Sequence, residues 1–281
     1  SKRVRGYLSA VDNDIHFGLG DRKSIDSLII QWNSGKIEKL ANLEANQTIE
    51  LSEENASVNK NLNNGNNYWF NKSDSSQLNY TNIENEFNDF EKEILLPFKQ
   101  STLGPSVTSG DVNNDNLEDI FIGGSKGQAG QLFIQINNHY EKKLNRVFLE
   151  DANYEDMESI FIDIDSDNDQ DLYVVSGGNE FNQRSENLKD RIYLNDGNGN
   201  FSRSNQSEIS DYTISGKTVS KIDFDQDGDQ DLIIGNRIIP QKYPLHEPSI
   251  IYENINGKFK NVTYKIAPEF ENFGIVNKVI T

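Results

Sequence analysis

The sequence predicts an all-β protein, in which a small β module at the N-terminus is followed by a partial β-propeller. Three observations predict this class. An acidic nonapeptide occurs three times, at residues 111–119, 163–171 and 223–231, and each copy is followed directly by a short apolar run. A second apolar run follows farther along each unit. Two of the units then carry the hairpin signals Asp196-Gly197 and Asn256-Gly257.

The three acidic loops have the residue spacing of a cation site. Positions 1, 3, 5 and 9 are Asp in every loop apart from Asn113, so oxygen donors recur at alternate residues and once more after a gap. Position 7 varies between Leu and Asp, as expected if its backbone carbonyl binds the ion. Position 6 is Asn or Gly, which both tolerate a left-handed backbone. The predicted ligand positions are Asp111, Asn113, Asp115, Leu117 and Asp119, then Asp163, Asp165, Asp167, Asp169 and Asp171, then Asp223, Asp225, Asp227, Asp229 and Asp231.

Calcium fits this spacing better than other ions do. The loops hold four, five and five acidic residues with no Lys or Arg inside, so like charges oppose compaction unless a cation is bound. An EF-hand needs a Glu at loop position 12, where this chain has Ile122, Val174 and Ile234. Magnesium prefers to keep its waters and rarely uses an all-protein cage. One acidic stretch could be a solvated charge run, but three copies of one pattern predict about three Ca²⁺ ions. Loop one is expected to bind most weakly because Asn113 removes a carboxylate.

The loops repeat at propeller-like intervals of 52 and 60 residues. The runs after them, at residues 120–124, 172–176 and 232–235, are typical of buried strands. We therefore expect each unit to be an antiparallel meander of about four short strands, with the acidic loop between the first two. One such sheet cannot cover both of its faces, so the blades must pack side by side.

The predicted domains are a module at 1–52, a linker at 53–67 and propeller blades at 68–281. Residues 24–32 alternate as a strand, 33–35 form a turn and 36–40 return. The linker is rich in Asn, Ser, Glu and Lys. Residues 84–99 are compatible either with a short helix or with an extended segment against the propeller.

The last residues resemble the start of another blade. Residues 273–281 are similar to the apolar lead-ins 160–162 and 218–222, and a fourth acidic loop would begin near position 283 at the 60-residue interval. We therefore expect about three blades and the start of a fourth, in a fragment whose remaining blades belong to the same polypeptide.

Composition excludes several function classes. The net charge is −18, and there is no basic block with interleaved aromatics, which argues against a nucleic-acid partner. The chain has no cysteine, so it has no thiolate nucleophile or disulfide framework. No apolar stretch approaches the roughly 20 residues that span a bilayer. A signal peptide is not recognisable in the residues given.

The sequence contains no catalytic constellation, so we expect a non-enzymatic protein. Residues 123–127 match the G-x-S-x-G pattern of hydrolases, but a second predicted strand follows where that motif needs a helix, which favours a blade turn. Tyr173, Tyr193 and Tyr252 lie in predicted strands, and packing between blades explains them better than a sugar-stacking platform.

Two family resemblances follow from these motifs. The acidic loops followed by apolar-Gly-Gly, as at 122–124, resemble the FG-GAP/VCBS repeats of calcium-binding propellers. Residues 16–20, followed by the strand and the turn of 32–35, look like the second half of an ASPIC/UnbV domain. Residues 175–181 and 240–244 are similar to VCBS-repeat proteins of Bacteroidetes-type bacteria that carry such domains. Asn113 in place of Asp, and Asn116 and Asn168 in place of Gly, are mild departures.

The resemblance implies a binding or adhesion module of an exported bacterial protein. The expected location is extracellular or on the cell surface or outer membrane of a Gram-negative bacterium, and the expected partner is an extracellular glycan or protein. Two alternatives stay open: part of a polysaccharide-active or other hydrolytic enzyme whose active site lies in missing segments, and a structural spacer.

Overall fold

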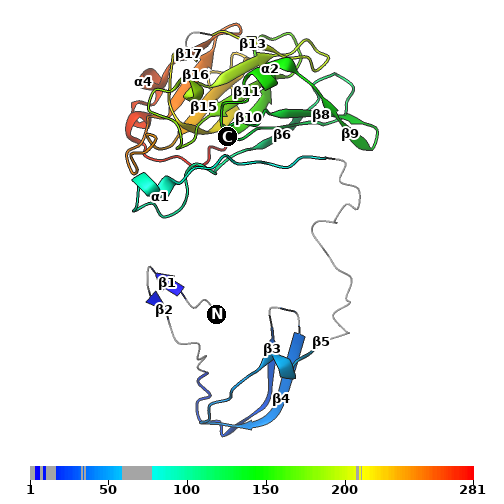
Figure 1. Cartoon of the computed structure of the whole chain (residues 1–281), viewed down its shortest axis with the longest axis vertical. Helices are drawn as coiled ribbons and strands as arrows, with labels where there is room; N and C mark the ends of the chain where they lie inside the picture. Colours follow the sequence, from blue (N-terminus) through cyan, green and yellow to red (C-terminus); the bar gives the residue numbers. More distant parts are fainter. Residues whose placement is uncertain are drawn as a thin grey trace. The chain divides into compact units, whose positions relative to one another are not determined.

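The computed structural model describes residues 4–6, 9–10, 17–32, 34, 36–58, 78–206, 209 and 211–281. The chain divides into two compact units, Ser1–Ser73 and Asp74–Thr281 (Figure 1). Regular structure in the described residues consists of antiparallel sheets and a few short helices. This confirms the predicted all-β class.

The first unit is a small β module. Its strands are β1 (Val4–Gly6), β2 (Ser9–Ala10), β3 (Ser24–Gln31), β4 (Lys36–Glu44) and β5 (Ser57–Val58), with the 3₁₀ turn η1 (Glu53–Asn55) before β5. The strand, turn and return predicted at 24–40 are the β3–β4 hairpin. β5 pairs with β4, so Ser57 and Val58 of the predicted linker belong to this sheet. Residues 59–67 of the predicted linker, and His16 of the N-terminal motif, lie outside the described residues.

The second unit contains three four-stranded antiparallel meanders, as predicted. We number these sheets as blades 1 to 3 in chain order. The strands of blade 1 are β6 (Val107–Gly110), β7 (Asp119–Ile122), β8 (Gln131–Ile136) and β9 (His139–Lys143). Those of blade 2 are β10 (Asp156–Ile162), β11 (Asp171–Ser176), β12 (Arg191–Leu194) and β13 (Ser202–Ser204). Those of blade 3 are β14 (Gly216–Ile222), β15 (Asp231–Asn236), β16 (Ile250–Asn254) and β17 (Phe259–Asn261).

The blades pack through their first strands. β10 contacts β6 on one side and β14 on the other, which is the side-by-side arrangement of a propeller (Figure 1). Short helical segments fill the connections: α1 (Asp89–Lys92), α2 (Arg146–Glu150), η3 (Glu186–Leu188), α4 (Thr263–Ile266) and η4 (Pro268–Asn272). The described residues form no closed ring of sheets. No helix among them is long and apolar enough to cross a membrane.

The hydrophobic core lies between adjacent blades. Tyr173 and Tyr252 belong to the cluster shared by blades 2 and 3, and Tyr193 belongs to the cluster shared by blades 1 and 2. Each of these three side chains is at most 2 % exposed. The interpretation of these tyrosines as packing residues is confirmed.

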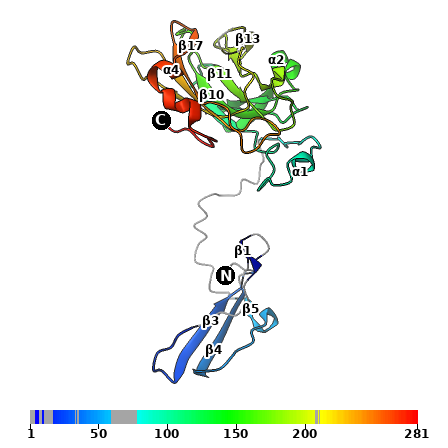
Figure 2. The ribbon, with the colours of Figure 1, turned by 90° about the vertical axis from the view of Figure 1, so that its left-hand side faces the viewer.

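Residues 78–106 form an extended strap along one end of the blades (Figures 1 and 2). The strap crosses the B–C loops, which join the second and third strands of each blade at residues 123–130, 177–190 and 237–249. The Tyr80 hydroxyl donates to the Gly123 carbonyl over 2.8 Å, and Lys217 Nζ donates to the Leu103 carbonyl over 2.7 Å. Of the two forms expected at 84–99, the structure shows an extended segment that contains only the single turn α1.

The end of the chain lies along β14 as β14 lies along β10. The Val279 N–H donates to Thr218 Oγ1 over 3.2 Å. The equivalent bond joins residues whose numbers are each lower by sixty: the Val219 N–H donates to Glu158 Oε2 over 3.1 Å. Residues 276–281 therefore occupy the position of the first strand of a following blade, in agreement with their resemblance to the lead-ins.

Candidate metal-binding loops

Each acidic loop joins the first and second strands of its blade, and its position 9 is the first residue of the second strand. Position 6 has a left-handed backbone in all three loops, as predicted, with φ of 66° at Asn116, 70° at Asn168 and 99° at Gly228. Position 4 is also left-handed, with φ between 59° and 63° at Asn114, Ser166 and Gln226. Position 4 could not be predicted to be left-handed, because Ser and Gln do not favour this conformation.

The position-9 aspartates Asp119, Asp171 and Asp231 are buried, and both oxygens of each carboxylate accept backbone hydrogen bonds. One oxygen accepts the N–H of loop position 2, at 3.0 Å, 3.0 Å and 3.1 Å in loops one to three. The other accepts an N–H from the third strand or its end, at 2.8 Å in each blade. Burial outweighs these donors and raises the pKa of Asp171 to about 7. Each oxygen keeps a second lone pair, so binding an ion remains compatible with this structural role.

Loops two and three each bring three carboxylates together. Oxygens of Asp163, Asp165 and Asp171 lie within 4.8 Å of one another, and so do those of Asp223, Asp225 and Asp227. Asp163 Oδ1 and Asp223 Oδ1 are buried and have no hydrogen-bond partner. A calcium ion ligated by these carboxylates would supply the missing partner, so the residues present fit the ion.

Loop one has a different arrangement. Asp111 Oδ1 accepts the N–H groups of Asn113 and Asp115, and Asp111 Oδ2 accepts the Asn116 N–H over 2.7 Å. Asn113 Nδ2 donates to Asp115 Oδ2 over 3.0 Å. Within the described residues, loop one forms no three-carboxylate group of the kind found in the other two. Its carboxylates accept hydrogen bonds from the loop itself, and the expectation that loop one is the weakest site stays a prediction.

Position 7 has side-chain roles that the sequence interpretation missed. Asp169 Oδ1 is buried without a partner, and burial followed by the neighbouring Asp167 carboxylate raises the pKa of Asp169 to about 6. Asp229 accepts from Ser166 Oγ of the preceding loop and from the Asn256 N–H, each over 3.3 Å. Leu117 has no such group. Coordination by the carbonyls of position 7 stays a prediction.

Asparagines at the ends of two third strands attach each blade to the preceding loop. Asn195 Nδ2 donates to the Val112 carbonyl over 2.8 Å, and Asn254 Nδ2 donates to the Ile164 carbonyl over 2.9 Å. Both acceptors are position 2 of the acidic loop in the neighbouring blade. The loop conformation is therefore coupled directly to the contact between blades.

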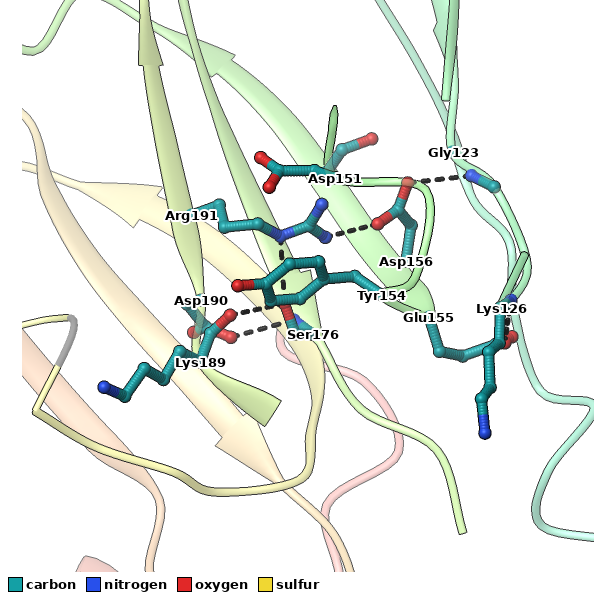
Figure 3. Close-up of polar contacts among 12 residues, drawn as sticks. Gly123, Lys126, Asp151, Tyr154, Glu155, Asp156, Ser176, Lys189, Asp190 and Arg191 are labelled. Carbon is teal, nitrogen blue, oxygen red and sulfur yellow. Dashed lines mark hydrogen bonds and ion pairs between the residues drawn. The ribbon is translucent and has the colours of Figure 1, made fainter. Parts of the chain in front are cut away.

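A buried ion pair in blade 2 contacts blade 1 at the B–C loop end through its aspartate (Figure 3). Arg191 forms an ion pair with Asp156, donates to Ser176 Oγ over 3.2 Å and lies over the Tyr154 ring at 4.2 Å. Asp156 Oδ2 also accepts the Gly124 N–H over 2.8 Å. The pair holds the first B–C loop against β10, and no local sequence pattern marks these two residues as partners.

Asp190 lies beside this arginine in Figure 3 and accepts from the Tyr173 hydroxyl over 2.7 Å and from the Ser176 N–H over 2.8 Å. Burial raises the pKa of Asp190 to about 6, although both donors and Arg191 oppose the change. The G-x-S-x-G segment nearby is followed by β8, and Ser125 Oγ donates to Asn82 and Glu84 of the strap. This geometry is a blade turn.

Meanders with an acidic loop between the first two strands, packed through their first strands, define a β-propeller-type repeat protein. A family model described as an FG-GAP-like repeat matches residues 163–234, and one described as ASPIC and UnbV matches residues 2–58. The chain is an FG-GAP-repeat protein with an ASPIC/UnbV domain. No curated protein matches it. FG-GAP repeats commonly bind Ca²⁺, and proteins that contain them are typically extracellular or surface-associated.

Asn254 and Asn195, which attach each blade to the preceding loop, are called clamp residues. Replacing Asn254 by Ala should lower the free energy of unfolding by about 2–3 kcal/mol. The substitution leaves the Ile164 carbonyl and the Gly257 N–H, which bonds to Asn254 Oδ1, without partners. Chemical denaturation in saturating calcium measures the change. The exposed Asn272→Ala should stay within about 0.5 kcal/mol of the parent. Equal stabilities for the two variants would contradict the clamp.

Replacing Asp190 by Asn should flatten the pH dependence of stability between about pH 4 and pH 6. Because the pKa is raised in the folded state, the folded protein holds the proton more tightly, and this contribution is lost as pH rises from about 4 through about 6. Over this range the parent should lose about 1–2 kcal/mol of its free energy of unfolding. This value is smaller than the full pKa difference implies, because the Asp190 side chain is partly exposed. Melting curves across this range at constant calcium check it, and parallel curves for the variant and the parent would refute it.

Proposed function

We propose that the second unit is a calcium-stabilised β-propeller module of an exported bacterial protein, and that it binds an extracellular glycan or protein. The observation that carries the calcium role is the pair of three-carboxylate groups in loops two and three, each with a buried oxygen that lacks a hydrogen-bond partner. Three ions are proposed, with loop one the weakest site because its carboxylates are already bonded within the loop.

Electrostatics supports a structural role for the ions. In loop two, burial and then the carboxylates of Asp167 and Asp163 raise the pKa of Asp165. Raised pKa values mean that the ionised, metal-free loop is destabilised by its own charges. A divalent cation offsets this repulsion. Calcium concentrations outside cells suit extracellular modules, which bind with Kd of about 10⁻⁴ to 10⁻³ M.

An exposed apolar patch supports a binding role. The patch comprises Ile94, Leu95 and Phe98 of the strap with Tyr243 and Leu245 of the third B–C loop, and these side chains are between 38 % and 87 % exposed. Two hydrogen bonds hold the segments together, from the Tyr243 N–H to Glu93 over 2.6 Å and from Lys92 to Gln241 over 2.7 Å. Contiguous exposed apolar residues commonly mark interaction sites.

We propose that this module lies outside the cell or on the surface of a Gram-negative bacterium. It has no nucleic-acid partner in this proposal, as the net charge of −18 favours. Further blades of the same polypeptide would share its inter-blade contacts. No group in the described residues is assigned to catalysis in this proposal. A hydrolytic role and a spacer role are outcomes that the binding experiment below distinguishes.

Calcium should raise the melting temperature of the chain, and a chelator should reverse the change. At a free calcium concentration 100-fold above Kd, each site contributes about 2.7 kcal/mol. Calorimetric titration should show that Asp163→Asn with Asp223→Asn removes the two tightest sites, whereas Asp111→Asn removes the weakest. A chelator-insensitive melt with no heat of binding would overturn the calcium role.

Replacing Leu95 and Phe98 by Ser should weaken ligand binding at least tenfold, equivalent to about 1.4 kcal/mol, with no change in the calcium-dependent melt. The measurement is a glycan array together with binding to bacterial and host surface proteins. Leu144→Ser is the matched control, because Leu144 is 72 % exposed but lies outside the patch. Turnover of an arrayed glycan would favour the hydrolase, and absence of any binding would favour the spacer.

A further inference from the structure

A second group of carboxylates lies at the B–C loop end of the blades. The second strand of each blade runs from its acidic loop to its B–C loop, so this group is at the other end of the blades from the proposed calcium loops. Glu84 comes from the strap, Glu155 directly precedes β10 and Glu180 belongs to the second B–C loop. Glu155 is completely buried and Glu180 is 9 % exposed.

Four oxygens in this group have no hydrogen-bond partner. Glu155 Oε2 accepts the Lys126 N–H over 2.8 Å (Figure 3), but Glu155 Oε1 accepts nothing. Neither oxygen of Glu180 has a partner with the geometry of a hydrogen bond, although the N–H groups of Glu180 and Asn179 lie near enough to oppose the rise in its pKa that burial causes. Glu84 Oε1 accepts from Asn82 and Ser125, whereas its buried Oε2 has no donor. Leaving buried carboxylate oxygens unpaired is costly, and so many in one place indicate that a positively charged group binds between them.

The carboxylates of Glu84 and Glu180 act on the carboxylate of Glu155. After burial, the carboxylates of Glu180 and Glu84 are among the groups that raise the pKa of Glu155, to about 9. The neighbouring Asp156 differs, because Arg191 neutralises it in an ion pair. No comparable ion pair to Glu84, Glu155 or Glu180 exists among the described residues.

Neither nearby lysine forms an ion pair with Glu84, Glu155 or Glu180, although the Lys126 ammonium opposes the rise in the pKa of Glu180. The side chain of Lys126 extends away from Glu155 in Figure 3, and its Nζ lies 4.7 Å from the centre of the Phe181 ring. Lys217 donates to the Leu103 carbonyl. Asp156 is paired with Arg191, and Glu158 with Lys278. The remaining charges that act in this region are the carboxylates of Glu84, Asp89, Glu155 and Glu180 and the cations of Lys126, Lys217 and Arg237, so negative charge is in excess.

We propose that Glu84, Glu155 and Glu180 bind a divalent cation, Ca²⁺, which attaches the strap to the junction of blades 1 and 2. Their oxygens do not meet the mutual spacing of 4.8 Å found in loops two and three. The ion therefore keeps water between itself and at least one carboxylate, a form of coordination that is common for calcium. Ser125, which donates to Glu84, and Lys126, whose peptide bonds to Glu155, place the first B–C loop against the same site.

The test is calcium titration by calorimetry on the full chain, with Glu180→Gln as the variant and Glu186→Gln as the matched control. Glu186 is in the same B–C loop, and its side chain is 77 % exposed. We expect Glu180→Gln to bind one calcium ion fewer than the parent, and Glu186→Gln to bind the same number. In chelator, Glu180→Gln should melt at or above the temperature of the parent, because it removes a buried charge. In calcium it should gain less stability.

A second readout uses Tb³⁺ in place of calcium. The Tyr80 hydroxyl lies against Gly123, and Glu84 and Glu155 both act on its pKa, so Tyr80 should sensitise terbium luminescence at this site. Tyr80→Phe and Glu180→Gln should each abolish the same part of the signal. That part should persist in Asp163→Asn with Asp223→Asn, which separates this site from the calcium loops.

Two results would overturn the proposal. One is that the parent and Glu180→Gln bind the same number of calcium ions, and that neither Tyr80→Phe nor Glu180→Gln changes the terbium luminescence. The other is evidence that a proton alone satisfies the site. In that case the terbium signal sensitised by Tyr80 is absent, and the stability of the parent falls as pH rises toward about 9, whereas that of Glu155→Gln does not. If Glu180→Gln unfolds in chelator, the terbium luminescence of Tyr80→Phe still shows whether an ion binds beside Tyr80, because this variant keeps all the carboxylates.

Discussion

The buried carboxylate at position 9 of each acidic loop is the interaction on which the rest of the propeller depends. It bonds to the start of its own loop and to the third strand of its own sheet, so one side chain fixes both the loop and the register of the blade. Hydrogen bonds to a charged group contribute about 1.5–3 kcal/mol each, more than neutral ones. Because the same loop's position 2 accepts from the next blade's asparagine, the constraint passes from blade to blade.

Much of this arrangement could be predicted because it repeats. The alternation of acidic residues, the apolar run after each loop and the turns at 196–197 and 256–257 depend on local backbone preferences, and each recurs in the structure as expected. The double role of position 9 could not be predicted, since a ligand and a structural acceptor need the same residue type. Asn195 and Asn254 did carry a signal: each stands two residues after a core tyrosine at the end of a third strand.

The features that the sequence did not predict are contacts between distant segments with no repeat. Asp156 and Arg191 are 35 residues apart, and their pairing depends on how β10 and β12 lie in one sheet. The strap shows the same limit. Residues 84–99 have helical spacing of apolar side chains, but Asp89 accepts the N–H groups of Gln100 and Ser101 and the amide of Asn179. These long-range bonds end α1 after one turn and hold the strap extended over the blades.

The acidic loops differ in how far their charges are balanced without an ion. Because of this difference, we expect calcium to affect loops two and three more strongly than loop one. Loop one closes its carboxylates with its own N–H groups and with Asn113. Loops two and three keep buried oxygens unpaired. Ser166 of loop two donates to Asp229 of loop three, and Asp229 also accepts the Asn256 N–H from the hairpin of its own blade. Under the proposed calcium role, repulsion in the absence of the ion would therefore concentrate at the contact between blades 2 and 3. The ion would act chiefly on this contact, because the two loops with unpaired buried oxygens meet there through Ser166 and Asp229.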